Sequence, residues 1–97
     1  MIRHVVMFTF NEGASEEQIG EAIAALAELP SLIPTVRGFR LGRDIGVNPG
    51  NFHLAVTADF DDVAGYLTYR DHPEHLRVIR EKGAPVVASR SAVQFEY

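Results

Sequence analysis

The first segment with a strand pattern runs from Ile2 to Phe10, where valine, isoleucine, phenylalanine and threonine dominate and an Asn-Glu-Gly turn follows. Its even-numbered positions are apolar except for His4, and its odd-numbered ones include Val5 and Met7. Successive side chains of a strand point to opposite faces, so both faces of this strand carry apolar groups. Such a strand predicts cover on both sides of its sheet.

A capping-box pattern marks the start of the first predicted helix, with Ser15 three residues before Gln18. Apolar residues then recur at helical spacing as far as Pro30, which lacks a backbone N–H and is expected to end the helix. These apolar residues are Ile19, Ala22, Ile23, Leu26 and Leu29. The pattern predicts an amphipathic helix of about four turns, followed by a connector over Ser31 to Pro34.

Two further strands are predicted on either side of a hairpin loop. The segments Val36 to Asp44 and Phe52 to Phe60 have strand composition, and Gly46 to Asn51 between them contains the turn sequence Asn-Pro-Gly. In the second of these segments every other residue is apolar, which is typical of a half-buried strand. A last strand is predicted over Ala88 to Glu96.

A second helical region is predicted from Val63 to about Glu81, with Asp61-Asp62 as its N-terminal cap. Pro73 fits the first turn of a helix but not its interior, so the region should break at Asp71-His72-Pro73. One piece then ends near Arg70, and a new piece begins at the proline. The pair Ala84-Pro85 should end the whole region.

The predicted order of elements is β-α-β-β-α-β, in a single domain over residues 1–97. With right-handed crossovers this order gives an α+β, ferredoxin-like antiparallel sheet with helices on one face. The other face would be bare, and exposed apolar surface costs roughly 25 cal/mol per Å². We therefore predict a homodimer in which two sheets pack face to face.

Composition excludes several kinds of protein. Thirteen acidic against nine basic residues give a net charge of -4, which argues against a nucleic-acid-binding surface. The chain has no cysteine, so disulfides, thiolate nucleophiles and cysteine metal sites are excluded. The N-terminal segment carries a charge and a histidine before only four apolar residues, unlike a signal peptide or a membrane span. We expect a cytoplasmic protein without a membrane partner.

The candidate chemistry lies in the run from Tyr69 to His75, which gathers two histidines, a phenol and two carboxylates around one predicted helix start. The apolar positions Leu76 and Ile79 share the helix face of His75, so the imidazole should point toward the interior. An inward imidazole needs a partner or a ligand. Because neutral imidazole accepts a proton near pH 7, His75 is either a general base or a core histidine bonded to Tyr69 or to backbone.

No metal or other cofactor is predicted. His72 and His75 form an H-x-x-H pair, but two ligands without a defined third make a poor metal site. His72 precedes the proline, where we expect it to cap the helix that follows.

Taken together, these motifs resemble the stress-responsive A/B barrel domain (Dabb) family of dimeric α+β barrels, over essentially the whole chain. The matching motifs are Ile2-Arg3-His4-Val5-Val6-Met7-Phe8, Leu32-Ile33-Pro34 with Val36 and Phe39, Phe60, Tyr69, and His72-Pro73-Glu74-His75.

The resemblance also implies a type of chemistry. The plant polyketide cyclase of this fold that makes olivetolic acid closes a linear polyketide by intramolecular aldol chemistry, in a pocket between sheet and helices. The resemblance implies His75 as general base and Tyr69 as hydrogen-bonding phenol, with His4 in support. His53 matches a further histidine of that cyclase, and Glu96 an acidic residue on its last strand, where it could orient an imidazole.

Three functions stay open from the sequence. The first is a cofactor-free acid-base enzyme acting on a ketone or polyketide-like molecule, with proton removal next to a carbonyl as its central step. The second is a non-catalytic, stress-responsive dimer that binds a small apolar ligand. The third is a cofactor-free monooxygenase, an interpretation that depends on the shared barrel fold alone.

Overall fold

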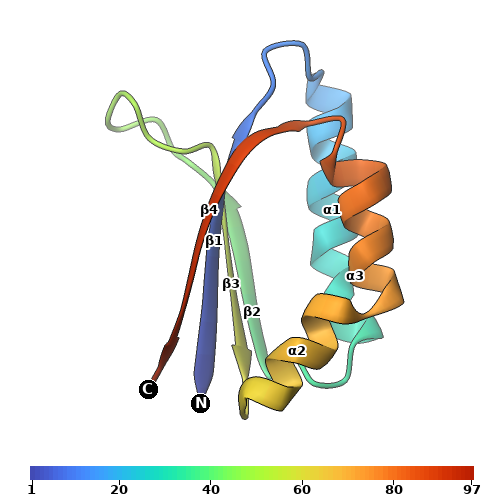
Figure 1. The fold of residues 1–97 in the computed structure, drawn as a ribbon. Helices are drawn as coiled ribbons and strands as arrows, with labels where there is room; N and C mark the ends of the chain where they lie inside the picture. The colour runs from blue at the N-terminus through green and yellow to red at the C-terminus, as the bar shows by residue number, and fades with distance from the viewer.

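The computed structural model describes all 97 residues, Met1–Tyr97, and has two layers. One layer is a four-stranded antiparallel sheet of order β2-β3-β1-β4, and the helices cover one of its faces (Figure 1). The strands are β1 (Ile2–Phe10), β2 (Gly38–Arg43), β3 (Leu54–Phe60) and β4 (Val87–Glu96). The helices are α1 (Glu16–Leu32), α2 (Val63–Asp71) and α3 (Pro73–Val78), which the π-helical turn η1 (Ile79–Gly83) continues. The predicted ferredoxin-like α+β fold is thus confirmed.

Helix α1 begins where its capping box predicts. The Ser15 hydroxyl accepts a hydrogen bond from the Gln18 N–H at 3.1 Å, and Gln18 Oε1 accepts one from the Ser15 N–H at 3.0 Å. The prediction that Pro30 ends this helix is wrong, because α1 continues past it. The proline removes a single N–H near the end of the helix, where the Ile33 N–H still bonds the Leu29 carbonyl at 2.9 Å.

The middle strands are shorter than predicted. The Val36 N–H bonds the Ile33 carbonyl at 3.2 Å in a turn, so β2 starts only at Gly38. Strand β3 starts at Leu54 rather than at Phe52. Strand β4 begins one position earlier than predicted, because the register shift between Thr9 and Phe10 still leaves Phe10 paired with Val87.

The predicted break in the second helical region is confirmed. Helix α2 ends at Asp71 and α3 starts at Pro73, with His72 between them. His72 caps α3 as predicted, because its Nδ1 accepts a hydrogen bond from the Glu74 N–H at 3.1 Å. Beyond α3 the chain widens into the π-helical turn η1 before it leaves for β4.

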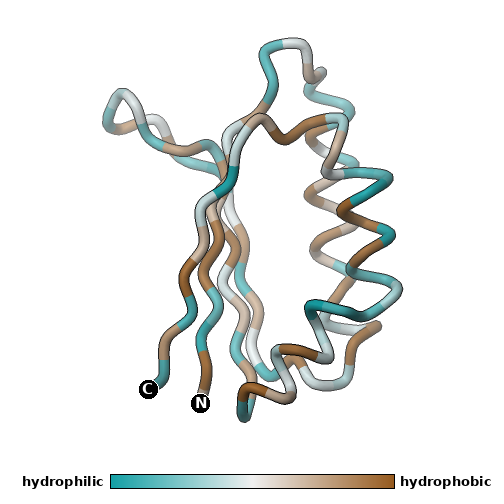
Figure 2. Tube along the Cα trace, viewed as in Figure 1, coloured by the Kyte–Doolittle hydropathy of each residue, from teal (hydrophilic) through white to brown (hydrophobic).

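The core lies between the sheet and the helices. Its largest fully buried side chains are Phe60, Leu29, Ile33, Val56 and Val86. Hydrophobic and hydrophilic residues alternate along the strands (Figure 2). No helix of the chain is both long enough and apolar enough to cross a bilayer.

The face of the sheet away from the helices carries exposed apolar side chains. Met7 of β1 and Val93 and Phe95 of β4 are among them, each exposed by 39 % or more. The loop between β2 and β3 projects to this uncovered side (Figure 1) and carries Ile45 and Val47, which are also exposed. Within one chain, nothing covers this face.

Candidate functional site

A cavity of about 580 Å³ lies between the helices and the sheet. Of its 23 lining residues, 17 are hydrophobic, so its interior is mainly apolar. Apart from two tyrosines, the titratable or charged side chains that line it are His4, Arg70, Asp71, His75 and Arg90. Small-molecule sites commonly have volumes of roughly 300–1,000 Å³ and combine apolar walls with a few polar groups. The cavity therefore suits a small molecule that is mostly apolar.

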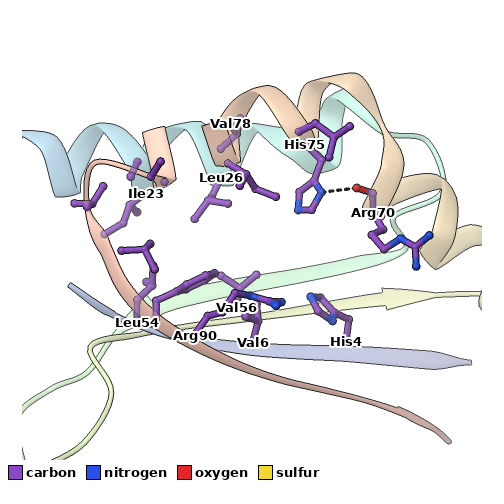
Figure 3. A pocket seen from close by; sticks show the side chains of 18 of the residues that line it. His4, Val6, Ile23, Leu26, Leu54, Val56, Arg70, His75, Val78 and Arg90 are labelled. Atoms are coloured by element: carbon purple, nitrogen blue, oxygen red, sulfur yellow. Dashed lines mark hydrogen bonds between the residues drawn. The ribbon is translucent and has the colours of Figure 1, made fainter. Parts of the chain in front are cut away.

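His75 enters this cavity from α3. Leu76 and Ile79 line the same cavity, as their spacing predicts, although each is about half exposed at 47 % and 49 %. The ring Nδ1 of His75 lies 3.0 Å from the backbone carbonyl of Arg70 (Figure 3). A carbonyl oxygen only accepts hydrogen bonds, so Nδ1 carries the hydrogen and Nε2 of the neutral ring keeps a free lone pair.

Tyr69 lies beside His75, with ring centroids 4.4 Å apart. Its side chain is only 3 % exposed and also packs against Phe60, with ring centroids 5.2 Å apart. Burial raises the pKa of the Tyr69 phenol to about 12, so the hydroxyl stays protonated at neutral pH. Tyr69 therefore brings a hydrogen-bond donor into the cavity that His75 also lines.

His4 enters the cavity from β1, opposite His75 (Figure 3). Its Nδ1 lies 2.8 Å from the side-chain nitrogen of Gln94, the residue that pairs with it across β1 and β4. Because the amide nitrogen donates to Nδ1, the neutral His4 ring carries its hydrogen on Nε2. The site thus combines one imidazole nitrogen that accepts a proton and one that donates a hydrogen bond.

Both cavity histidines are neutral at pH 7. Burial is the main cause that lowers the pKa of His4 to about 4, and the charge of Arg90 adds to it. Burial also lowers the pKa of His75, while the hydrogen bond to the Arg70 carbonyl opposes this effect. The proton-accepting form of His75 is therefore the resting form.

The structure does not bring His53 into this cavity. His53 is exposed and lies in the segment before β3, where its Nδ1 accepts a hydrogen bond from the Phe10 N–H at 2.9 Å. Its ring packs beside that of Phe10, with centroids 5.3 Å apart. In this structure His53 fixes the junction between β1 and the loop before β3 and contacts no other histidine.

Glu96 is not part of the cavity either. It pairs with Ile2 at the end of β4 and is exposed. Gln94 occupies the position opposite His4, so an amide rather than the predicted carboxylate orients that imidazole. An amide leaves the ring neutral, whereas a carboxylate would favour the imidazolium.

Sequence reasoning missed Gln94, Tyr66 and Arg90. The ring of Tyr66 lies 5.1 Å from that of His4, and Arg90 lines the cavity from β4. Side chains alternate along a strand, so the sequence places Gln94 and Arg90 on the same face of β4. Only the pairing register with β1 shows that this face lies opposite His4 and toward the cavity. No group of three or more His, Cys, Asp or Glu side chains is arranged to hold a metal ion.

The fold and cavity together define a small ferredoxin-like α+β protein with an apolar pocket under its helices. The family model of the stress responsive A/B barrel domain (Dabb) matches residues 2–97. The chain belongs to this family.

Individual relatives agree with this assignment. The Arabidopsis thaliana stress-response A/B barrel domain-containing protein HS1 is 30% identical over 79 residues, which are 77% of this chain and 71% of HS1. The crystal structure of a dimeric ferredoxin-like protein of unknown function from Thermobifida fusca is 38% identical, with a TM-score of 0.90 over 99% of this chain and 90% of that one.

Enzymes are found among the structural neighbours. The hydroxynitrile lyase of Passiflora edulis has a TM-score of 0.85 at 22% identity, over 97% of this chain and 90% of its own. An antibiotic biosynthesis monooxygenase has a TM-score of 0.75 at 16% identity, over 100% and 98% of the two chains. At these identities the likeness shows the fold alone.

Proposed function

We propose that this protein is a cofactor-free acid-base enzyme that acts on a small apolar molecule containing a ketone, by aldol chemistry of the polyketide cyclase type. One observation carries the proposal. The His75 Nε2, which is free to accept a proton, lies in an apolar cavity together with two hydrogen-bond donors, the Tyr69 hydroxyl and the His4 Nε2–H.

These groups match the needs of an intramolecular aldol closure. His75 Nε2 removes a proton from the carbon next to a carbonyl, and the enolate oxygen that forms accepts hydrogen bonds from Tyr69 and His4. The enolate carbon then attacks a second carbonyl of the same molecule, which forms a C–C bond and an alkoxide. The alkoxide takes the proton back from the His75 imidazolium, so no cofactor or oxidant is consumed.

The cavity walls support the same chemistry. A mainly apolar wall excludes water, which strengthens hydrogen bonds to a developing enolate. The neutral state of both histidines fits their roles, because an imidazolium at His75 would have no lone pair to accept the proton. His53 and Glu96 lie outside the cavity and have no role in this proposal.

Exchange of α-protons in D₂O tests the proposal without knowledge of the natural substrate. A panel of β-diketones and methyl ketones is incubated with the protein, and loss of the α-proton signals is followed by NMR. We expect His75→Gln and Tyr69→Phe to slow exchange by roughly 100-fold or more, the usual contribution of general acid-base groups. His53→Gln is the matched control, since it removes an exposed histidine outside the cavity, and it should exchange at the unsubstituted rate.

The alternatives give different results in the same experiment. If no ketone exchanges above the buffer rate while apolar molecules bind, the protein is a ligand-binding dimer and His75 is a structural histidine. Oxygen consumption with an aromatic substrate would instead indicate a cofactor-free monooxygenase. An exchange rate unchanged by both cavity substitutions would exclude the catalytic roles assigned to His75 and Tyr69.

We also propose that the protein is a homodimer whose two sheets face each other. The uncovered face carries exposed apolar side chains on β1 and β4, and the loop with Ile45 and Val47 projects to the same side (Figure 1). A second copy would cover these groups, and the relative from Thermobifida fusca is described as dimeric. The helix-facing cavity lies on the opposite side of the sheet, so each subunit keeps its own site.

A further inference from the structure

Arg90 is a cation that faces an otherwise mainly apolar cavity. It lies on β4 opposite Phe8, and both residues line the cavity from the sheet side. Its side chain extends along the cavity floor toward His4, beside Val6 and Val56 (Figure 3). Arg90 is nevertheless an exposed residue, so its guanidinium stays in contact with solvent while it faces the cavity.

Arg90 has no acidic partner in the chain. Six of the other arginines form ion pairs with carboxylates, but neither a salt bridge nor a side-chain hydrogen bond involves Arg90. Asp71, the one acidic residue that lines the cavity, is already held by Arg70 through contacts of 2.8 Å and 3.0 Å. The cavity therefore has an uncompensated positive charge.

The charge of Arg90 affects the pKa values of both cavity histidines. It contributes to the lowered pKa values of both His4 and His75, so its guanidinium lies within electrostatic reach of the two imidazoles. A negative group bound to Arg90 would therefore sit close to the proposed site of proton transfer.

We infer that Arg90 binds a carboxylate on the ligand, so that the substrate class is an apolar keto acid rather than a neutral ketone. A guanidinium presents paired N–H donors that match the two oxygens of a carboxylate. The apolar walls would bury the rest of the molecule. This inference rests on the proposed function, because it treats the cavity as the substrate site, and it adds the anionic end of the substrate.

A pair of probes that differ only in charge tests the inference by binding, without turnover. Octanoate and octanamide have the same chain length, and their affinities for the full-length protein are measured at pH 7 by titration calorimetry. We expect octanoate to bind roughly ten-fold more tightly than octanamide, the size of effect expected for charge-assisted hydrogen bonds. Arg90→Met should reduce this ratio to about one, and Arg90→Lys should keep part of it.

Arg80→Met is the matched control, because it removes the same charge from an exposed residue outside the cavity. It should leave the ratio unchanged. Equal binding of the two probes to the unsubstituted protein would overturn the inference, as would a ratio that persists in Arg90→Met or is lost instead in Arg70→Met. The proposed function is judged separately by α-proton exchange, so a neutral ketone that exchanges normally would leave it standing while the keto-acid preference fails.

Discussion

The ring of Tyr69 lies against the ring of His75, with centroids 4.4 Å apart, although the two residues are on different helices. On one continuous helix, residues six positions apart would be separated by about 9 Å along the axis and about 120° around it. The break at His72 and Pro73 removes this separation. The same break lets His75 bond back to the Arg70 carbonyl, which fixes its tautomer. A local proline signal therefore assembles the proposed base and its donor.

The first prediction concerns the pH dependence of α-proton exchange. The active form of His75 is neutral, and its pKa is lowered mainly by burial. The rate should therefore rise with pH through a midpoint below the usual histidine value of about 6.5 and then stay level. The level region should extend toward the pKa of Tyr69 at about 12, where the donor is lost. A midpoint above 6.5, measured by NMR exchange rates, would contradict this assignment.

The second prediction concerns stability and His4. Its pKa falls from 6.5 in the unfolded chain to about 4 in the folded protein, so between these values only the unfolded state binds the proton. The contribution of neutral His4 to the free energy of unfolding is fully present above pH 6.5 and is lost as the pH falls to about 4. This contribution is at most about 3 kcal/mol. His75 acts in the same direction, because its pKa is also lowered.

Urea denaturation at a series of pH values measures this effect. His4→Gln should flatten the slope of unfolding free energy against pH between about 4 and 6.5, relative to the unsubstituted protein. Ala27→Gln is the control and should leave the slope unchanged, because it alters an exposed, non-ionisable position of α1. Equal slopes in the two variants would show that His4 is not buried in its neutral form.

The third prediction concerns Gln94 as a positioning residue. Its amide bonds Nδ1 of His4 at 2.8 Å and keeps the ring neutral with the hydrogen on Nε2. Gln94→Glu is nearly isosteric but places a carboxylate beside the ring, which should raise the pKa of His4. NMR titration of the His4 ring protons measures the change directly. If Gln94 had only a structural role, Gln94→Glu would leave the titration of His4 unchanged. Gln94→Leu removes the hydrogen bond to His4 without adding a charge, so it should abolish the tautomer preference of the ring.

Much of the fold was predictable from the sequence because its signals are local. The capping box at Ser15, the apolar spacing along α1 and the proline at position 73 each depend on neighbours within a turn or two. Pro30 misled the prediction because its missing N–H falls near a helix end, where its loss costs little. Strand β2 starts later than predicted because Val36 makes a turn hydrogen bond to Ile33, and β3 starts at Leu54 rather than at Phe52.

The site was only partly predictable, because its remaining groups depend on strand register. Glu96 and Gln94 are two positions apart on the same face of β4, and only the pairing with β1 decides which of them meets His4. The alternation along β4 is also unusual, since its apolar Val93 and Phe95 face away from the helices while Arg90 faces the cavity. A sequence pattern alone does not tell which face is covered.

The last prediction concerns the uncovered face of the sheet. Phe95 is 45 % exposed and lies on this face, where we propose that a second subunit packs. Phe95→Glu would bury a charge without a partner in that interface, which is strongly unfavourable, so the protein should become monomeric at micromolar concentration. Sedimentation equilibrium measures the mass. Ala27→Glu on an exposed position of α1 is the control and should remain dimeric. A monomer without any substitution would refute the dimer, and a dimer that persists in Phe95→Glu would place its interface elsewhere.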